Sequence, residues 1–167
     1  MQKIVLAVAL AGLFALPLCA QEVPSAEIYG GYQLVHNEGE SAHGFTAAFE
    51  KNVTSVVGIV GDFGFATDVA ESGAEAYSFA GGPRFSYRAD KVRPFAHALF
   101  GLVRFDADAS SNNFGMIFGG GLDISVSESV SIRPVQLEAV SVRLGGNWNT
   151  GMRYSAGVVF KLGSLTK

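Results

Sequence analysis

The chain has 167 residues, of which 12 are basic and 15 acidic, so its formal net charge is −3. This acidic balance does not favour a nucleic-acid partner. The single cysteine, Cys19, excludes an intramolecular disulfide, so the folded chain must be stabilised by other means, chiefly backbone pairing.

The N-terminus has the features of a secretory signal peptide. Lys3 supplies a positive charge, residues 4–18 are apolar, and Ala20 offers a small-residue cleavage site before Gln21. The apolar run is shorter than the roughly 20 residues that a membrane-spanning helix needs. We therefore expect export of the chain, with residues 1–20 as signal peptide and residues 21–167 as one domain. No later apolar run is long enough to span as a helix, so any membrane insertion must be as a barrel.

The rest of the chain alternates between apolar and polar residues in eight segments, which predicts eight β-strands with one apolar and one polar face each. The predicted strands are residues 27–36, 44–51, 57–65, 77–88, 92–105, 114–126, 130–139 and 149–163. Short turns are expected at 52–55, 89–91 and 127–129. Longer polar loops are expected near 37–43, 67–75, 106–112 and 140–149.

The first four strands each separate an apolar from a polar face, and the fourth, residues 77–88, shows the clearest alternation in the chain. Their predicted outward residues include Ile28, Tyr32, Leu34, Phe45, Phe49, Ile59, Phe63, Phe79 and Phe85. Their predicted inward residues include Glu27, Gln33, Thr46, Glu50, Asp62 and Arg84. Each of these strands therefore places at least one charged or amide side chain on its inner face.

The fifth and seventh strands contain prolines, which cannot donate a hydrogen bond to a neighbouring strand. We expect a bulge at Pro94 in the fifth strand, whose inward face is predicted to carry Ala96, Ala98 and Arg104. Its outward face is predicted to carry Leu99, Val103 and Phe105. In the seventh strand the apolar residues shift from even-numbered positions, up to Ile132, to odd-numbered positions, from Val135 onward. A bulge at Arg133 and Pro134 is therefore expected. That bulge turns Arg133, Gln136 and Glu138 inward, and Asp123 joins them from the sixth strand.

The last strand separates its two faces cleanly. Met152, Tyr154, Ala156, Val158, Phe160 and Leu162 fall on one face, and Arg153, Ser155, Gly157 and Lys161 fall on the other. The order Ser155, Gly157, Phe160, Leu162 resembles the signal, polar-x-Gly-x-x-hydrophobic-x-hydrophobic, by which outer-membrane β-barrels are recognised by their assembly machinery.

With its signal peptide, eight alternating segments and this terminal strand, the chain resembles the small eight-stranded OmpA-like barrels of the outer membrane protein β-barrel domain family. The resemblance implies an all-β, eight-stranded, antiparallel up-and-down transmembrane barrel in the cell outer membrane. It also implies contact with outer-membrane lipid and lipopolysaccharide, insertion by the barrel assembly machinery, and a monomer. A role in envelope structure, or in surface interaction through four external loops, is expected.

The inward charged residues predict a paired network in the lumen. Its expected members are Glu50, Asp62, Arg84, Arg104, Asp123, Arg133, Glu138 and Arg153. Eight strands enclose a lumen that side chains just fill, and charges removed from water need partners, which guanidinium and carboxylate groups provide. A structural plug is the favoured interpretation, and a gate on a narrow, porin-like solute path is the alternative.

Two further alternatives remain open. A soluble, lipocalin-like binding barrel would place the apolar faces inside, which the inward charges disfavour. A lipid-A-modifying barrel enzyme would need a base beside a nucleophile, yet His36, His43 and His97 have no Ser-x-His or His-x-Ser neighbour. No enzyme activity is therefore predicted.

No metal site or cofactor is predicted either. The acidic pairs are Glu38 with Glu40 and Asp106 with Asp108. They are interpreted as solvated loop charges, because isolated carboxylates on a loop do not make a cation site.

Overall fold

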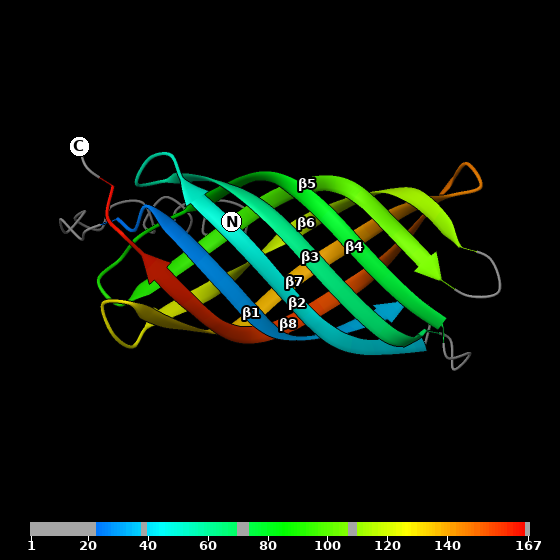
Figure 1. Ribbon diagram of the computed structural model, residues 1–167, viewed down its shortest axis with the longest axis horizontal. Helices are drawn as coiled ribbons and strands as arrows, with labels where there is room; N and C mark the ends of the chain where they lie inside the picture. Colours follow the sequence, from blue (N-terminus) through cyan, green and yellow to red (C-terminus); the bar gives the residue numbers. More distant parts are fainter. Residues whose placement is uncertain (1–22, 38–39, 70–73, 107–109, 166–167) are drawn as a thin grey trace, which may run out of the picture.

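The computed structural model describes residues 23–37, 40–69, 74–106 and 110–165. In this part of the chain, eight antiparallel strands close into a barrel in which each strand pairs with its sequence neighbours and β8 pairs with β1 (Figure 1). The strands are β1 (Ala26–Asn37), β2 (Glu40–Asn52), β3 (Val57–Val69), β4 (Ala74–Ser86), β5 (Val92–Asp106), β6 (Ser111–Ser125), β7 (Val130–Leu144) and β8 (Asn147–Leu162). The predicted all-β, up-and-down fold is confirmed.

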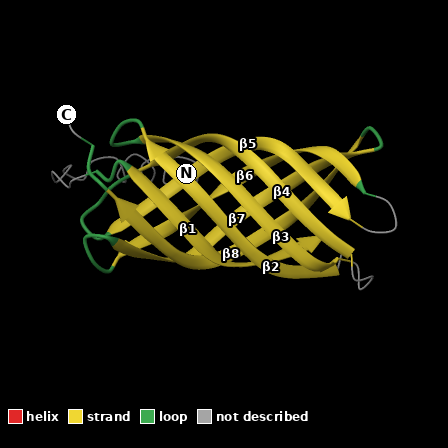
Figure 2. Cartoon of the chain, in the orientation of Figure 1, coloured by secondary structure: helices red, strands yellow, loops and turns green. Residues whose placement is uncertain are grey.

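Strands account for most of the described chain, and the rest is loop and turn (Figure 2). None of the described segments is a helix long and apolar enough to cross a membrane. The predicted signal peptide, residues 1–20, lies outside the described residues and stays a prediction.

β1 begins and β8 ends at the same end of the barrel, on the left in Figure 1. Two backbone hydrogen bonds join the chain ends there, from the Ser25 amide to the Gly163 carbonyl at 3.4 Å and from the Leu165 amide to the Val23 carbonyl at 2.7 Å. We call this the terminal end and the other the distal end. The predicted short turns, between β2 and β3, β4 and β5, and β6 and β7, lie at the terminal end.

At the distal end the predicted longer loops are wrong, because the strands run farther than expected. The strand bounds leave two residues between β1 and β2, four between β3 and β4, four between β5 and β6, and two between β7 and β8. Polar residues continue the ladder there, as in the pairs His36 with Ser41 and Asn37 with Glu40. Antiparallel pairing uses backbone groups, so polar side chains need not end a strand.

The connection between β7 and β8 shows why one of these loops is so short. Gly145 and Gly146 have φ angles of +57° and +93°. Positive φ at both central residues defines the tight two-residue hairpin turn in which glycine is favoured. The pairs Leu144 with Asn147 and Val142 with Asn149 therefore lie inside a segment that the sequence suggested was a loop.

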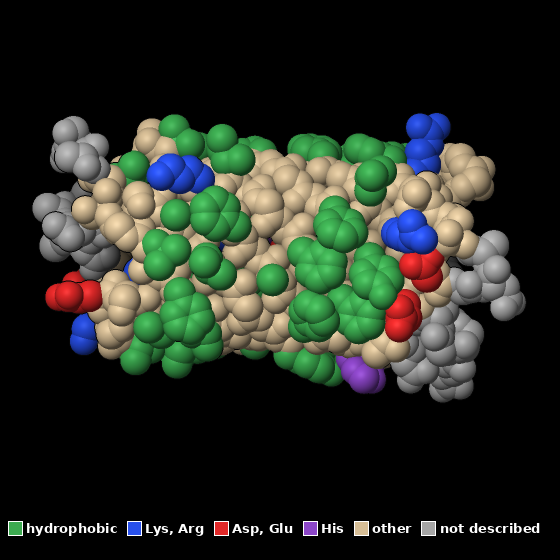
Figure 3. Space-filling view, viewed as in Figure 1, with side chains coloured by type: hydrophobic (Ala, Val, Ile, Leu, Met, Phe, Trp, Pro, Cys, Tyr) green, Lys and Arg blue, Asp and Glu red, His purple; other side chains and the backbone are tan. Residues whose placement is uncertain are grey.

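The outward faces of the strands are apolar, as predicted. Ile59, Phe79 and Phe85 expose 59%, 54% and 54% of their surface. Figure 3 shows such side chains over the barrel wall, with charged side chains toward its two ends. Outward apolar residues and inward charges are the reverse of a lipocalin-like barrel, so that alternative is not supported.

Aromatic rings form a continuous patch across β2, β3 and β4. Phe45 lies 5.8 Å from Phe63 and 5.4 Å from Phe65, measured between ring centroids. Phe63 contacts Phe79 at 5.0 Å, and Phe65 contacts Tyr77 at 5.1 Å. Aromatic girdles of this kind mark the membrane interfaces of transmembrane barrels.

The two proline predictions have different outcomes. The bulge in β7 is confirmed, because the pairing of β7 with β8 changes register between Arg133 and Gln136. The bulge at Pro94 is wrong, since the register between β5 and β6 is constant through the Pro94–Leu122 pair. The Pro94 carbonyl accepts a hydrogen bond from the Tyr87 amide at 2.9 Å, so the residue stays in the ladder through its acceptor alone.

The predicted faces of β5 are reversed in the structure. The buried residues of β5 are Arg93, Phe95, His97, Leu99 and Val103. Ala96, Phe100 and Arg104 lie on the exposed face. Both faces of β5 carry large apolar residues, so its alternation does not show which face is inside.

Candidate functional site

A cluster of charged side chains crosses the lumen, and every strand contributes to it. Its members, called the lumen cluster below, are Glu27, Glu50, Asp62, Arg84, Arg93, His97, Asp123, Arg133, Glu138 and Arg153. All are buried, with at most 8% of each residue exposed. Because inward residues of a strand recur at every second position, a closed barrel brings these side chains from eight strands into one space.

The part of the lumen cluster nearest the terminal end is built around Arg93. Its guanidinium donates to Glu27 Oε1 at 2.6 Å and also binds the other carboxylate oxygen of Glu27. The same guanidinium donates from Nε to Asp123 Oδ2 at 3.1 Å. Arg133 Nε then donates to Asp123 Oδ1 at 2.6 Å. Two guanidinium groups and two carboxylates thus neutralise one another in alternation.

Phe95 separates two arginines of the lumen cluster. The Cζ atoms of Arg84 and Arg133 each lie 4.3 Å from the centroid of the Phe95 ring. Arg133 also lies 4.2 Å from the ring centroid of Tyr29. Guanidinium groups are attracted to aromatic faces, which explains why a phenylalanine of β5 points into a charged lumen.

A second chain of contacts begins at Glu50. Arg84 Nη1 donates to Glu50 Oε2 at 2.9 Å, and Arg84 Nη2 lies 3.2 Å from His97 Nδ1. His97 Nε2 lies 2.7 Å from Glu138 Oε1. Arginine has no acceptor and a carboxylate has no donor. The contacts therefore require a neutral imidazole that accepts at Nδ1 and donates from Nε2.

This second series of contacts ends at Arg153, whose guanidinium is shared by two carboxylates. Its Nε donates to Glu138 Oε2 at 2.6 Å and its Nη2 to Glu138 Oε1 at 2.8 Å, a bidentate pair. Its Nη1 donates to Asp62 Oδ1 at 3.0 Å. Bidentate guanidinium–carboxylate pairs fix geometry as well as charge, so Arg153 ties β3, β7 and β8 together across the lumen.

Arg88, in the connection between β4 and β5, completes the charge balance. Its Nη2 donates to Glu27 Oε1 at 3.3 Å and to Asn52 Oδ1 at 2.9 Å. Burial lowers the pKa of Arg88 from its usual value, and the positive charge of Arg93 lowers that pKa further. With Arg88 included, five arginines face the five carboxylates of the lumen cluster, and His97 is neutral.

The structure brings seven of the eight predicted network residues into the lumen cluster: Glu50, Asp62, Arg84, Asp123, Arg133, Glu138 and Arg153. The predicted inward position of Arg104 is wrong. Its side chain is 45% exposed and pairs with Asp106 at 3.0 Å near the distal end of β5. This follows from the reversed faces of that strand.

Sequence reasoning left three residues out of the network. Glu27 is predicted to face inward but is not among the expected members of the network, and the reversed prediction for the faces of β5 leaves out Arg93 and His97. Arg93, Phe95, His97 and Leu99 follow a period of two. These four residues therefore lie on one face of β5. The pattern within the strand does not show that this face is the inner one, because both faces carry large apolar residues.

The predicted assembly signal occupies alternating faces of β8. Ser155 is 7% exposed and faces the lumen, whereas Phe160 and Leu162 are 52% and 44% exposed and face outward. A Cβ on Gly157 would lie 2.1 Å from the Gly30 carbonyl oxygen, so β1 packs closely here. Recognition of this segment by the assembly machinery stays a prediction.

The histidines outside the lumen lie near the distal end. His36 Nδ1 lies 2.9 Å from Ser41 Oγ on the neighbouring strand, a His–Ser contact that the sequence spacing did not suggest. The His43 ring stacks on Tyr32 with 6.5 Å between centroids. Among the described residues, no group of three potential metal ligands is placed to hold an ion.

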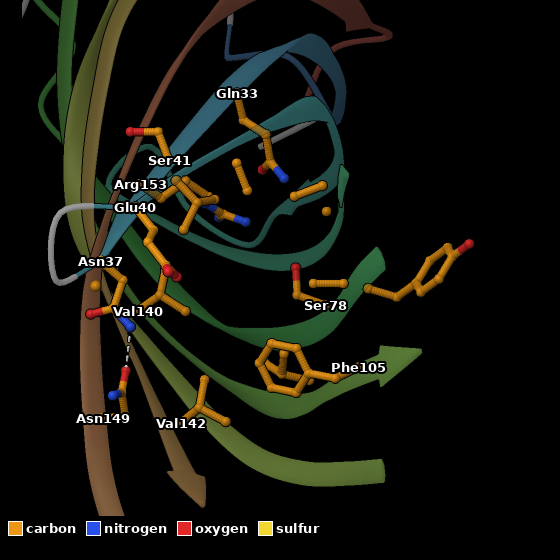
Figure 4. Close-up of a pocket in the computed structure, with 18 of the residues that line it drawn as sticks. Gln33, Asn37, Glu40, Ser41, Ser78, Phe105, Val140, Val142, Asn149 and Arg153 are labelled. Atoms are coloured by element: carbon orange, nitrogen blue, oxygen red, sulfur yellow. Dashed lines mark hydrogen bonds between the residues drawn. The ribbon is translucent and has the colours of Figure 1, made fainter. Parts of the chain in front are cut away.

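The distal half of the lumen contains a cavity of about 220 Å³ that the lumen cluster does not fill. Arg153 and Gln33 line its floor, and Asn37 and Asn149 lie toward the strand ends, where Asn37 Nδ2 donates to Asn149 Oδ1 at 2.6 Å (Figure 4). Its walls are largely apolar. The lumen is thus divided into a charged plug and a distal cavity.

Comparison with known proteins finds no matching family model and no matching curated sequence. Solved structures do match. Neisserial surface protein A has a TM-score of 0.63 at 15% identity, covering 82% of this chain and 96% of its own. OprG of Pseudomonas aeruginosa has a TM-score of 0.63 at 11% identity, covering 86% and 98%. Ail, the attachment invasion locus protein of Yersinia pestis, has a TM-score of 0.55 at 16% identity, covering 83% and 99%. The chain therefore has the fold of the small eight-stranded outer-membrane β-barrels.

Proposed function

We propose that this protein is a non-enzymatic, integral outer-membrane barrel that contributes to envelope structure or to interactions at the cell surface. The observation that carries the proposal is the division of faces, with apolar side chains on the outer wall and the paired lumen cluster inside. A transmembrane barrel satisfies its backbone polar groups between strands and needs an apolar outer band. Both conditions are met by this fold.

The orientation in the membrane follows from the two ends. Both ends of the described chain lie at the terminal end, and an exported barrel enters the outer membrane from its periplasmic side. The terminal end of this barrel is therefore assigned to the periplasm and the distal end to the outside. Lipid and lipopolysaccharide would contact the outer wall, including the aromatic patch of Phe45, Phe63, Phe65, Tyr77 and Phe79.

The proposal has three further parts. Residues 1–20 direct export, the barrel is a monomer, and the assembly machinery inserts it by recognising Ser155, Gly157, Phe160 and Leu162. A surface role has support from one protein of the same fold, because Ail was solved in complex with the heparin analogue sucrose octasulfate. The short distal connections of this chain place any such contact on strand ends such as His36, Glu40 and Asn149.

The lumen cluster is proposed to act as a structural plug rather than a gate. Its arginines and carboxylates are buried, and the hydrogen bonds link β1 with β5 and β3 with β8 across the lumen. Breaking a buried pair leaves an uncompensated charge, so the arrangement resists opening. Opposite strands are held at fixed separation by these contacts.

Cell fractionation tests the proposal directly. The full chain, expressed with its N-terminal segment, should be recovered in the outer-membrane fraction and released only by detergent. Its folded form should migrate differently from the boiled form on a gel. Recovery of the chain in the soluble periplasm without detergent would contradict the proposal.

A lipid-modifying enzyme is kept as a second candidate because of one contact. His36 Nδ1 lies 2.9 Å from Ser41 Oγ at the distal end, which is the spacing of a base and a nucleophile. No third described side chain is seen to orient the imidazole, as a catalytic base requires. Overexpression of the wild type and of Ser41→Ala should leave the lipid A profile unchanged; a change that Ser41→Ala abolishes would establish the enzyme.

A further inference from the structure

The distal cavity exists because the inward residues around it are small. Those lining it include Ala42, Gly64, Ala66, Ala76 and Gly151. Its apolar walls are completed by Val35, Val103, Phe105, Val140 and Val142. Figure 4 shows Gln33, Phe105 and Val142 pointing toward this space from different strands. The volume of about 220 Å³ lies below the roughly 300–1,000 Å³ of pockets for drug-sized ligands, so it fits a small or narrow molecule.

Three polar groups converge on the floor of the cavity above Gly64. A Cβ on Gly64 would lie 2.5 Å from Ser78 Oγ, 3.1 Å from Arg153 Nη1 and 3.2 Å from Gln33 Oε1. Because residue 64 is glycine, this position carries no side-chain atom. A small polar head group at this position would reach all three side chains once the Ser78 hydroxyl rotates away about its side-chain bond.

Gln33 carries a buried acceptor without a donor. The residue is 2% exposed, its Nε2 donates to the Phe65 carbonyl at 3.0 Å, and its Oε1 has no hydrogen-bond partner. Exchanging the amide oxygen and nitrogen would place two acceptors against each other, so the bond to Phe65 fixes the orientation. A buried acceptor left unpaired costs free energy, which a ligand hydroxyl would recover.

The other floor groups determine which head group fits. Arg153 is already shared by Asp62 and Glu138, and its Nη1 retains one N–H that is not used in those bonds. A hydroxyl can donate to Gln33 Oε1 and accept from that N–H or from the Ser78 hydroxyl. A carboxylate offers no donor to Gln33 and would meet the negative charges of Asp62 and Glu138.

We propose that the distal cavity binds a small neutral amphiphile, with its hydroxyl head on Gln33 Oε1 above Gly64 and its hydrocarbon body against the valines. Burial of apolar surface favours the body, and the unpaired acceptor selects the head. The site goes beyond the proposed membrane function, and its binding is measured on purified, folded protein.

Binding can be tested with 1-hexanol and the barrel in lipid nanodiscs. Methyl resonances of Val103 and Val142 should shift in a saturable manner as 1-hexanol is added. Hexanoate should bind about tenfold more weakly, the loss expected for one unmade hydrogen bond to a buried group. Shifts that grow linearly without saturation, or hexanoate that binds as tightly as 1-hexanol, would overturn the proposal.

Two matched variants locate the site. Ala66→Phe fills the cavity, whereas Ala47→Phe makes the same change on the outer face of β2. Saturable shifts should persist in Ala47→Phe and disappear in Ala66→Phe; binding that survives in Ala66→Phe would place the alcohol elsewhere and refute the assignment.

Gln33→Leu tests the head group without filling the cavity, and it also serves if Ala66→Phe does not fold. Because the unpaired acceptor is gone, the affinity for 1-hexanol should fall about tenfold, and the preference for 1-hexanol over hexanoate should decrease. A preference that remains unchanged in this variant would remove Gln33 from the site.

Discussion

Each arginine of the lumen cluster is held by more than one acceptor or ring, and this sharing determines what a single substitution should do. Arg153 contacts Glu138 and Asp62, Arg93 contacts Glu27 and Asp123, and Arg84 contacts Glu50, His97 and the Phe95 ring. Removing one such arginine leaves a buried carboxylate with fewer partners. The free-energy cost therefore comes from the charge that remains, not from the bond that is lost.

Arg153→Met should destabilise the barrel by about 3–5 kcal/mol, because Asp62 loses its guanidinium and Glu138 loses its bidentate partner. The measurement is urea unfolding in lipid vesicles, followed by the fluorescence of Trp148, the single tryptophan. Arg104→Met is the matched control. Since Arg104 is exposed at the barrel surface, its removal should change stability little. Equal losses in the two variants would contradict a buried, paired Arg153 and an exposed Arg104.

At the scale of the strand, the sequence was most informative where one face was apolar and the other polar. β4 and β8 alternate without interruption, and the parity change in β7 revealed the bulge at Arg133. β5 could not be read in this way, because Phe95, Leu99 and Val103 face inward while Phe100 and Leu102 face outward. Phe95 faces inward because the guanidinium groups of Arg84 and Arg133 pack on its ring. These residues come from β4 and β7, so the alternation within β5 could not predict the contact.

Ala156 tests the outer face of β8. It lies near the middle of the strand, pairs with Tyr32 and is exposed on the barrel wall. Ala156→Arg should cost about 2–4 kcal/mol if this surface lies at the centre of the bilayer. Ala156→Leu, which keeps the wall apolar, should be tolerated. Vesicle unfolding curves that show the same stability for both variants would contradict a lipid-facing β8.

The turn between β7 and β8 allows a similar comparison of glycines. Gly145 has a φ angle of +57°, and Gly145→Ala should cost about 1–2 kcal/mol because a Cβ disfavours that conformation. Gly61 has no positive φ and open space around its missing Cβ, so Gly61→Ala should not destabilise the barrel. Urea midpoints of the two variants measure the difference. A Gly145→Ala midpoint at or above the wild-type value would exclude the tight turn.

For the whole molecule, the arrangement of the lumen determines what the barrel can pass. The distal cavity ends at Arg153, and the lumen cluster continues from there to Arg93 and Glu27 at the terminal end. Eight strands leave an interior just wide enough for side chains or for one small ligand. A solute would therefore have to displace paired charges, and the cavity is a pocket rather than the mouth of a pore.

Reconstituted wild-type protein should accordingly show no large, steady conductance in planar bilayers. Arg84→Ala removes the side chain that links Glu50 with His97 and packs on Phe95. It should leave Glu50 with only the contact to Arg93 at 3.8 Å and admit water beside it, so that leakage appears in the same recordings. Arg104→Ala, on the outer face, should remain silent. Stable porin-scale channels in the wild type would reject the plug, and leakage confined to Arg84→Ala would show that the paired charges close the lumen.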